Sequence, residues 1–251
     1  MGVAVLLKQV PDTTAKISIS GDRVDESSIT KWSISPYDEY ALENAIKLKE
    51  SGFGEVVAIT CGPSRSAKCL TEAAAVGADR LIHIISESPL DSIQVQALLS
   101  AAVEETGCDI VMCGKQAADT NSGSTGPGLA VSLGFSCVGG VTGVSIENDL
   151  ASATRLGPSG LEEVEVRVPC VFTFDKGDSE LRRPNVRGIM MAKKKPIDSF
   201  SPDDLGVEIS NSMVSIKSHS SPPEKQPGQK FIGSDSVPEV VRKLREEANV
   251  I

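Results

Sequence analysis

Residues 114–128, which read GKQAADTNSGSTGPG, have the composition of a loop that holds a ligand. The stretch contains four glycines and four hydroxyl side chains and very little that is apolar. Backbone N–H groups of glycine and serine can approach a phosphate closely, and a helix that begins near Thr125 would direct its positive end at that phosphate. The stretch therefore predicts a phosphate-binding loop.

A solvated Ser/Gly turn without a ligand is the alternative for this loop. The stretch is not a Walker A motif, because no Gly-Lys-Ser/Thr ends it, and it is not a G-x-G-x-x-G motif. However, links from a buried strand to a helix are normally about two to six residues long, and this one is longer. Its length favours a ligand-binding role.

Two other polar stretches also follow predicted strands: KQVPDTT at 8–14 and CGPS at 61–64. In a doubly wound sheet, ligands bind at the carboxyl ends of the strands, near the point where the strand order reverses. We therefore expect these stretches and the 114–128 loop to converge on one pocket, and its chemistry suits an adenine nucleotide.

Cysteine and histidine do not form a recognisable metal or catalytic motif. None of the six cysteines belongs to a C-x-x-C pair, and the chain has two histidines, so no metal site is predicted. His83 and His219 have no Ser or Cys at a catalytic spacing and are interpreted as core or solvent residues. Cys61 lies in apolar surroundings before Gly-Pro, which favours a packing role at the wall of the pocket over a nucleophile.

The first half of the chain alternates strands and helices. Ser35 can cap the first helix, Pro36 occupies its first turn and Gly52 follows its end. This alternation predicts an α/β fold with a doubly wound, mostly parallel sheet and right-handed crossovers. The strands are expected at 2–10, 54–63, 80–85 and 108–114, and the helices at 35–52, 65–79, 91–107 and 125–137.

The second half of the chain has a different pattern. The pattern of residues 138–174 predicts added antiparallel strands with glycine turns. Earlier in the chain, the pattern of residues 16–34 predicts a hairpin-like excursion. Residues 175–196 are charged and irregular, and a Ser- and Pro-rich segment then leads to an amphipathic helix at 238–251. Such a polar segment does not suit a compact core, so it predicts an extended C-terminal arm.

The bulk composition excludes several classes of function. The 251 residues carry a net charge of −9, which argues against non-specific binding to nucleic acid or anionic membranes. No apolar run reaches the roughly 18 residues of a membrane span. The apolar run at the N-terminus is too short for a signal peptide, so a cytoplasmic location is expected.

Six motifs together resemble the beta subunit of electron transfer flavoprotein, and the resemblance extends from residue 1 to about 197. They are KQVPDT at 8–13, SPYDEYALENAIKLKE at 35–50, AITCGP at 58–63, GAD at 77–79, GKQAAD at 114–119 with TGP at 125–127, and VRGIMMAKKKPI at 186–197.

This resemblance implies a fold of the adenine-nucleotide alpha-hydrolase-like type and a role as an electron carrier without bond-making chemistry. The beta subunit pairs with an alpha subunit that holds most of the flavin adenine dinucleotide (FAD). The heterodimer takes electrons from flavin dehydrogenases, such as the acyl-CoA dehydrogenases of fatty acid oxidation, to a membrane quinone oxidoreductase or another acceptor. Members of the family occur in the cytoplasm or in the mitochondrial matrix. The implied division is a nucleotide-binding domain at 1–197 and a C-terminal arm and helix at 198–251 that pack on the partner subunit.

The resemblance also implies functional residues. Thr13 would lie near the flavin of the alpha subunit, and 174–196 would be the recognition loop for partner dehydrogenases. The nucleotide site would use Leu6, Ser35, Pro36, Tyr37, Asp38, Cys61, Gly114, Lys115, Gln116, Ala117, Asp119, Thr120, Asn121, Ser122, Gly123, Ser124 and Thr125. Partner docking would use Val186, Ile189, Met190, Lys193 and Lys194.

The sequence leaves open which nucleotide is bound, because the family contains two types of beta subunit. Ordinary beta subunits bind adenosine monophosphate (AMP), whereas electron-bifurcating members bind a second FAD. Residues 120–124, TNSGS, match neither pattern. A stand-alone nucleotide-binding protein of the universal-stress type is a further alternative. An ATP-using enzyme of the same fold is disfavoured, because strand one is followed by KQVPD instead of a Ser-Gly-Gly-x-Asp-Ser loop.

Overall fold

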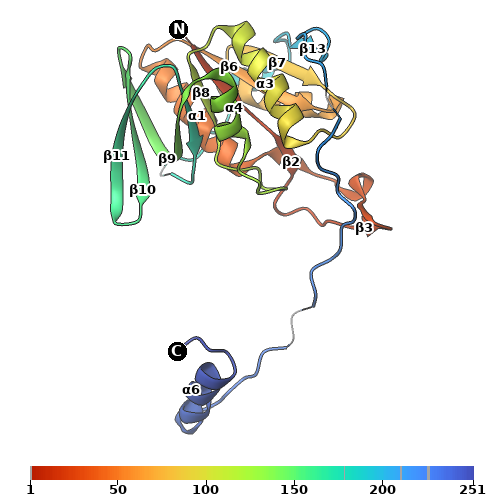
Figure 1. Cartoon of the computed structure of the whole chain (residues 1–251), viewed down its shortest axis with the longest axis vertical. Helices are drawn as coiled ribbons and strands as arrows, with labels where there is room; N and C mark the ends of the chain where they lie inside the picture. The colour runs from red at the N-terminus through yellow and green to blue at the C-terminus, as the bar shows by residue number, and fades with distance from the viewer. Residues whose placement is uncertain (1, 178, 210, 225–226) are drawn as a thin grey trace.

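The computed structural model describes residues 2–177, 179–209, 211–224 and 227–251. Its centre is a nine-stranded sheet with the order β11-β10-β9-β12-β8-β1-β6-β7-β13 (Figure 1). The strands are β1 (Gly2–Leu6), β6 (Glu55–Gly62), β7 (Arg80–Ile85), β8 (Ile110–Gly114), β9 (Ser136–Glu147), β10 (Leu150–Gly157), β11 (Gly160–Arg167), β12 (Cys170–Phe174) and β13 (Asp198–Phe200).

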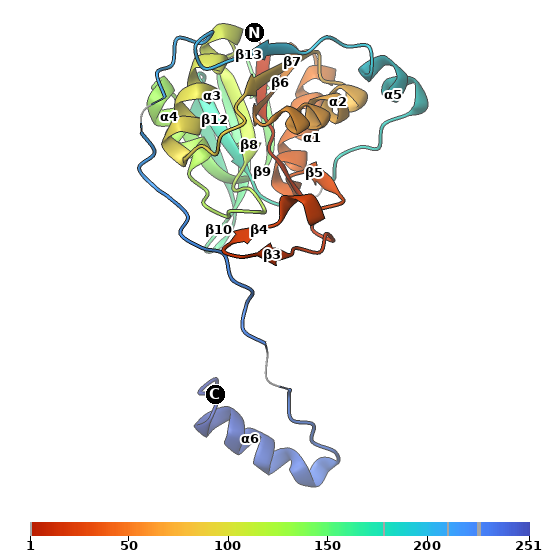
Figure 2. The ribbon, with the colours of Figure 1, turned by 90° about the vertical axis from the view of Figure 1, so that its right-hand side faces the viewer.

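Helices cover both faces of the parallel part of the sheet, and this confirms the predicted doubly wound α/β fold. Helices α1 (Pro36–Glu50) and α2 (Ala67–Val76) lie on one face. Helices α3 (Ser92–Thr106) and α4 (Thr125–Leu133) lie on the other (Figure 2). The core consists mainly of Val, Ile, Leu and Ala, as expected for parallel strands that are buried on both faces.

Two details of the second half differ from the sequence prediction. The helix expected to reach residue 137 ends at Leu133, because Gly134 adopts a left-handed φ of 68° and closes it. Strand β12 was expected to be antiparallel, but it runs parallel to both β8 and β9. Among the described strands of the nine-stranded sheet, only the β9–β10 and β10–β11 pairs are antiparallel. Strand β12 therefore continues the core sheet, and the β9–β11 meander extends it.

The excursion after β1 forms two small antiparallel sheets. Strand β3 (Ile19–Ser20) pairs with β4 (Arg23–Val24), as the Ser-Gly-Asp turn predicts. Strand β5 (Trp32–Ile34) pairs with β2 (Gln9–Pro11) and not with that hairpin. This pairing brings the start of α1 directly beside the end of β1.

The chain beyond residue 197 first follows the body and then leaves it. Strand β13 pairs with β7, and the backbone N–H of Met213 donates to Asp91 at the start of α3 (2.7 Å). The backbone N–H of His219 donates to Asp22 in the β3–β4 hairpin (2.9 Å). Helix α6 (Val237–Glu246) then stands well away from the sheet (Figures 1 and 2).

Candidate functional site

The carboxyl ends of β1, β6 and β8 meet at one edge of the sheet, as the sequence predicted. The chain runs from β1 to β6 and β7 on one side of β1 and then returns to β8 on its other side. The strand order therefore reverses between β1 and β8, where a doubly wound sheet leaves its ligand crevice. The loop that contains residues 115–124 begins at this crevice.

Asp38 joins the ends of these two strands. Its carboxylate accepts hydrogen bonds from the backbone N–H groups of Lys8 and Gly114, each at 2.8 Å. Asp38 belongs to the first turn of α1 and is 6% exposed. It therefore connects three elements of the site, and burial raises the pKa of its carboxyl to about 7.

Ser35 acts on the loop instead of on its own helix. The sequence predicts a Ser35 side-chain cap on α1, but its hydroxyl makes no such hydrogen bond. It accepts from the backbone N–H of Ala118 at 3.3 Å. The prediction of a side-chain cap was therefore wrong, and the first turn of α1 begins instead with Pro36.

Ion pairs and hydrogen bonds hold the first half of the loop. The Lys8 ammonium lies 2.8 Å from Asp119. The Lys115 ammonium lies 2.8 Å from Asp175, just after β12, and the hydrogen bond to Asp175 raises the pKa of Lys115. The Gln116 amide donates to Asn121 at 2.9 Å. These contacts position the loop relative to both β1 and β12.

The second half of the loop leads into the N-terminus of α4 and leaves one polar group unused. The Ser124 hydroxyl is buried and, within the described part of the chain, has no hydrogen-bond partner. The Ser124 carbonyl, in contrast, accepts from Gln96 at 2.9 Å. A buried hydroxyl without a partner is costly.

Glycines allow the backbone to come close around this turn. Gly123 has a left-handed φ of 65°. A Cβ atom on Gly126 would lie 2.3 Å from the Thr173 Cγ2 atom of β12. The first turn of α4 is thus pressed onto the sheet.

Leu6 and Cys61 lie at the ends of β1 and β6. Both pack in the apolar cluster on the α3 and α4 face of the sheet. Burial raises the pKa of the Cys61 thiol to about 12, which favours a neutral packing group over a thiolate nucleophile. His83 is buried in β7, and its Nε2 lies 3.1 Å from the Gly62 carbonyl oxygen.

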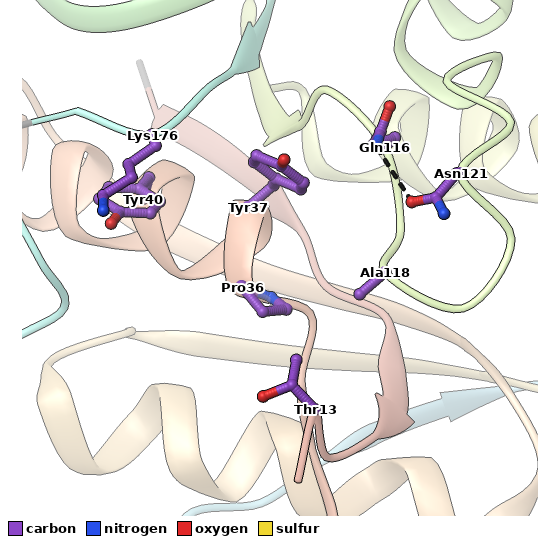
Figure 3. Close-up of a pocket in the computed structure, with 8 residues that line it drawn as sticks. All are labelled: Thr13, Pro36, Tyr37, Tyr40, Gln116, Ala118, Asn121 and Lys176. Carbon is purple, nitrogen blue, oxygen red and sulfur yellow. Dashed lines mark hydrogen bonds between the residues drawn. The ribbon is translucent and has the colours of Figure 1, made fainter. Parts of the chain in front are cut away.

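An open pocket of about 380 Å³ lies on the outer side of the loop (Figure 3). Thr13 lies at one side, next to Pro36, and the Gln116–Asn121 pair lies at another. Tyr37 lies between them, with the Lys115 ammonium 4.9 Å from the centre of its ring. The remaining lining residues are Tyr40, Ala118 and Lys176.

Asp12 supports the loop that carries Thr13. Its carboxylate accepts from the backbone N–H of Thr14 at 2.9 Å and pairs with Lys31 at 2.7 Å. The hydrogen bond from Lys31 is the largest cause that lowers the pKa of Asp12 well below its usual range. The carboxylate thus stays charged and fixes Thr13 at the pocket.

The segment that follows β12 is clamped onto α1 by Arg182. Its guanidinium donates to Glu43 from Nη2 at 2.9 Å and to Glu50 from Nη2 at 3.0 Å, and its backbone N–H donates to Glu43 at 3.0 Å. The Glu43 side chain is 6% exposed. Lys195 secures the far end of the segment by donating to the Ala78 carbonyl at 2.6 Å.

Helix α5 (Val186–Ala192) lies between these two anchors, in the region expected to be irregular. Gly188 allows it to approach α2, because a Cβ there would lie 2.4 Å from the Ala75 carbonyl oxygen. Its outer face is apolar: Val186 is 75% exposed and Met190 62%. The other large exposed apolar residues of α5 are Ile189 and Met191.

The structure therefore brings together the residues at the strand ends that the sequence analysis singled out. The predicted docking residues Val186, Ile189 and Met190 lie apart from them, on α5. The sequence analysis included Lys8 in the stretch 8–14, Tyr40 and Glu43 in the motif 35–50, and Asp175, Lys176 and Arg182 in the segment 174–196, but it gave none of them an individual role. Single charged or aromatic side chains of this kind carry no periodicity, so their roles depend on partners that are far away in the sequence.

In residues 2–177, 179–209, 211–224 and 227–251, no three His, Cys, Asp or Glu side chains are arranged to hold a metal ion. Over the same ranges, no helix has the length and apolar character needed to cross a membrane.

Comparison with known proteins shows similarity along the whole chain. The family model described as "Electron transfer flavoprotein domain" matches residues 26–205. A protein of Bacillus subtilis named electron transfer flavoprotein subunit beta is 33% identical over 258 residues, which covers 100% of both chains. The human protein of that name is 34% identical over 250 residues, with 97% of this chain and 96% of the human one covered. A mitochondrial form from Arabidopsis thaliana is 33% identical over 255 residues, with 100% of both chains covered.

Proposed function

The chain belongs to the electron transfer flavoprotein family as a beta subunit, and on that premise we propose how it carries electrons. It binds an adenine nucleotide at the crevice between β1 and β8, covers one side of an FAD held mainly by an alpha subunit, and presents α5 to redox partners. Electrons then pass from flavin dehydrogenases to a downstream acceptor. The observation that carries the nucleotide assignment is the unpartnered Ser124 hydroxyl at the start of α4.

The residues of the loop suit a nucleotide in chemical type and position. Hydroxyls at Ser122, Ser124 and Thr125 can donate to phosphate or ribose oxygens, and the N–H groups of the first turn of α4 favour an anion. Cys61 and Leu6 supply an apolar wall. These neutral donors and close-packed glycines bind and orient the nucleotide, and no bond-making step is required of them.

The open pocket beside Thr13 is the proposed face toward the alpha subunit's flavin. Tyr37 and Tyr40 offer flat apolar surfaces there, and Lys176 supplies positive charge. The flavin supplies the redox chemistry when it is bound. The side chains of this pocket would exclude water from one side of it and orient it relative to the nucleotide loop.

Helix α5 is proposed to dock partner dehydrogenases. Exposed Val186, Ile189 and Met190 can enter an apolar pocket of a partner, and Lys193 and Lys194 follow them directly. Exposed cations at the rim of an interface mainly raise the rate of association with an acidic partner and set its orientation. We therefore expect a partner surface with an apolar centre and an acidic border.

Denaturing the purified complex with its alpha subunit should release nucleotide in a defined ratio. One AMP and one FAD per heterodimer is the expected result for an ordinary member, and mass spectrometry of the released molecules would measure it. Two FAD molecules per heterodimer would identify an electron-bifurcating member with FAD in the loop. A folded complex without flavin, colourless in the visible range, would reject the proposed function. A stable monomer or homodimer that does not bind the alpha subunit would instead support a stand-alone nucleotide-binding protein.

The C-terminal helix is proposed to pack on the alpha subunit. Val237, Val240, Val241 and Leu244 share one face of α6 at helical spacing. Among the described residues, 231–251 hydrogen-bond only with one another. A ten-residue helix is marginal on its own in water, so its apolar face needs a partner.

Removing residues 222–251 should weaken the heterodimer at least ~10-fold, which corresponds to about 1.4 kcal/mol. The melting temperature of the isolated chain should change little, because the removed segment does not contact the body through any described hydrogen bond. Analytical ultracentrifugation would measure the dissociation constant. Leu244→Ser should weaken binding as well, whereas Arg242→Ser on the polar face should not. Equal affinity of the truncated and full chains would contradict the proposal.

A further inference from the structure

Lys176 is the only charged side chain among the described residues that line the open pocket beside Thr13. The other lining groups are neutral: a hydroxyl, tyrosine rings, small apolar side chains and the amide pair of Gln116 and Asn121. Figure 3 shows Lys176 and Tyr40 at one side of the pocket and the amide pair at the other. A ligand in this pocket therefore meets one formal charge, and that charge is positive.

The neighbouring lysines of the site are already paired with carboxylates. The Lys115 ammonium lies 2.8 Å from Asp175, and the Lys8 ammonium lies 2.8 Å from Asp119. Lys176, in contrast, is exposed and has no ion-pair partner in the described part of the chain. Its ammonium is therefore available to a group that enters the pocket.

Two carboxylates lie near the pocket without neutralising Lys176. Glu39 and Glu180 line a neighbouring hollow, which shares Pro36 and Tyr40 with the pocket. Neither of them forms an ion pair with Lys176 within the residues that the structure describes. Burial also raises the pKa of Glu39 and so opposes its ionisation. The positive charge of Lys176 is thus not cancelled inside the chain.

The backbone of Lys176 is held in place although its ammonium is free. The backbone N–H of Asp175 donates to the Val141 carbonyl of β9 at 2.9 Å, and that of Lys176 donates to the Asp175 carboxylate at 2.7 Å. A Cβ atom on Gly177 would lie 2.6 Å from the Thr142 carbonyl oxygen, so the next residue is pressed onto β9 as well. The base of the side chain is therefore fixed beside the pocket, which reduces the ordering cost when a ligand binds.

The rest of the lining suits a flat ring with polar edges. Tyr37 and Tyr40 offer aromatic surfaces to the faces of such a ring. The amides of Gln116 and Asn121 and the hydroxyl of Thr13 can form hydrogen bonds with its edges. These groups fit the flavin ring that the proposed function places at this pocket.

We propose that Lys176 is a specificity-determining residue that makes this pocket favour reduced over oxidised flavin. The proposal rests on the proposed function, which places the ring of the alpha subunit's FAD here. The oxidised ring is uncharged, and electrons that arrive from a dehydrogenase add negative charge to it unless a proton follows. Lys176 stabilises that negative charge through its ammonium, while it keeps its own proton and forms no bond. Charge placed beside the ring is a means by which a protein sets the potential of a flavin.

Lys176→Met should lower the reduction potential of the FAD in the complex with the alpha subunit. The variant keeps the apolar stem of the side chain and removes its charge. At the effective dielectric constant of a protein surface, a unit charge several ångströms away changes an equilibrium constant about 10-fold or more. The preference for reduced flavin should therefore fall at least ~10-fold, which for a two-electron couple corresponds to about 30 mV. Spectroelectrochemical titration, followed by the visible absorption of the flavin, would measure this shift.

The affinity for oxidised FAD separates a charge effect from a structural one. Because the oxidised ring is uncharged, Lys176→Met should bind oxidised FAD as tightly as the natural chain does, and quenching of flavin fluorescence on binding would measure it. A residue that only packs, or that meets a phosphate of the FAD, would affect both redox forms alike. Equal weakening of oxidised and reduced FAD, with an unchanged potential, would therefore overturn the proposal.

Two further variants control for the substitution itself. Lys176→Arg keeps the positive charge, so it should keep the potential of the natural complex. Lys68→Met removes a lysine whose side chain is 64% exposed on α2 and does not line the pocket, so the potential should not change. An equal decrease of the potential in Lys176→Met and Lys68→Met, or in Lys176→Met and Lys176→Arg, would count against a local charge at Lys176.

The same measurements distinguish failure of this proposal from failure of the proposed function. A complex that contains FAD, with the same potential in Lys176→Met as in the natural chain, would overturn the role of Lys176 and leave the proposed function intact. A folded complex without flavin would reject the proposed function, and the role of Lys176 with it.

Discussion

Replacing Gly114 with alanine is expected to remove the nucleotide from the purified complex and to lower the free energy of unfolding by about 2 to 3 kcal/mol. The added Cβ would lie 2.6 Å from both Asp38 Oδ1 and Tyr37 Cβ, and 2.8 Å from the Tyr37 carbonyl carbon. A flexible side chain could move away, but here the obstacle includes the backbone of α1. Strand β8 is also held by pairing with β1 and β12, so neither side can give way without displacing the loop.

Urea unfolding and nucleotide analysis of the Gly114→Ala variant would measure both effects. Gly143→Ala on β9 is the matched control, because a Cβ there meets nothing within 4 Å. That control should stay within about 0.5 kcal/mol of the natural chain and keep its nucleotide. Full nucleotide content in Gly114→Ala would show that the end of β8 does not have to lie where Asp38 holds it.

Replacing Arg182 with methionine is expected to destabilise the chain by about 2 kcal/mol and to raise the KM for the partner dehydrogenase several-fold. Breaking a buried ion pair costs about 3 to 5 kcal/mol, because a buried charge is left without a partner. The Glu43 side chain is 6% exposed, but that of Arg182 is 33% exposed, so solvent screens part of the loss. The loosened segment carries α5, so docking should suffer more than turnover at saturating partner.

The double variant Arg182→Met/Glu43→Gln separates the effect of an unpaired buried carboxylate at Glu43 from the effect of losing the contact between Arg182 and α1. It removes the unpaired buried carboxylate, so it should recover much of the stability lost in Arg182→Met, while the KM stays high. Arg242→Met, which breaks only the exposed pair with Glu246 in α6, should cost less than about 0.5 kcal/mol. Recovery of the KM together with stability in the double variant would contradict a docking role for the clamp.

The sequence predicted the body of the fold because its signals are local. Apolar runs of strand length, Pro36 in the first turn of α1 and the glycines that end α2, α3 and α4 all act within a few residues. The parallel direction of β12 was missed, since apolar pattern is the same for a parallel and an antiparallel strand. Helix α5 was missed because its seven residues keep most of their apolar side chains exposed.

The candidate site shows the same division between local and distant information. Composition and spacing alone identified the loop at 114–125 and its place after a strand, because glycine and hydroxyl residues are distinctive wherever they cluster. The roles of Ser35 and Asp38 could not be read from the motif SPYDEY, which predicts only a helix start. Their partners, Ala118 and Gly114, lie 83 and 76 residues away.

The residues by themselves thus determined the family, the alternation of strands and helices, and the loop at which a nucleotide is expected. Only the tertiary structure decided which side chains line the open pocket and which hold the backbone in place. Asp38 is the clearest case, because a carboxylate next to a nucleotide loop suggests a ligand contact, whereas both of its oxygens are used by Lys8 and Gly114. The physical reason is that a hydrogen bond depends on distance in space, and strand order brings β1 and β8 together from positions that are about a hundred residues apart in the chain.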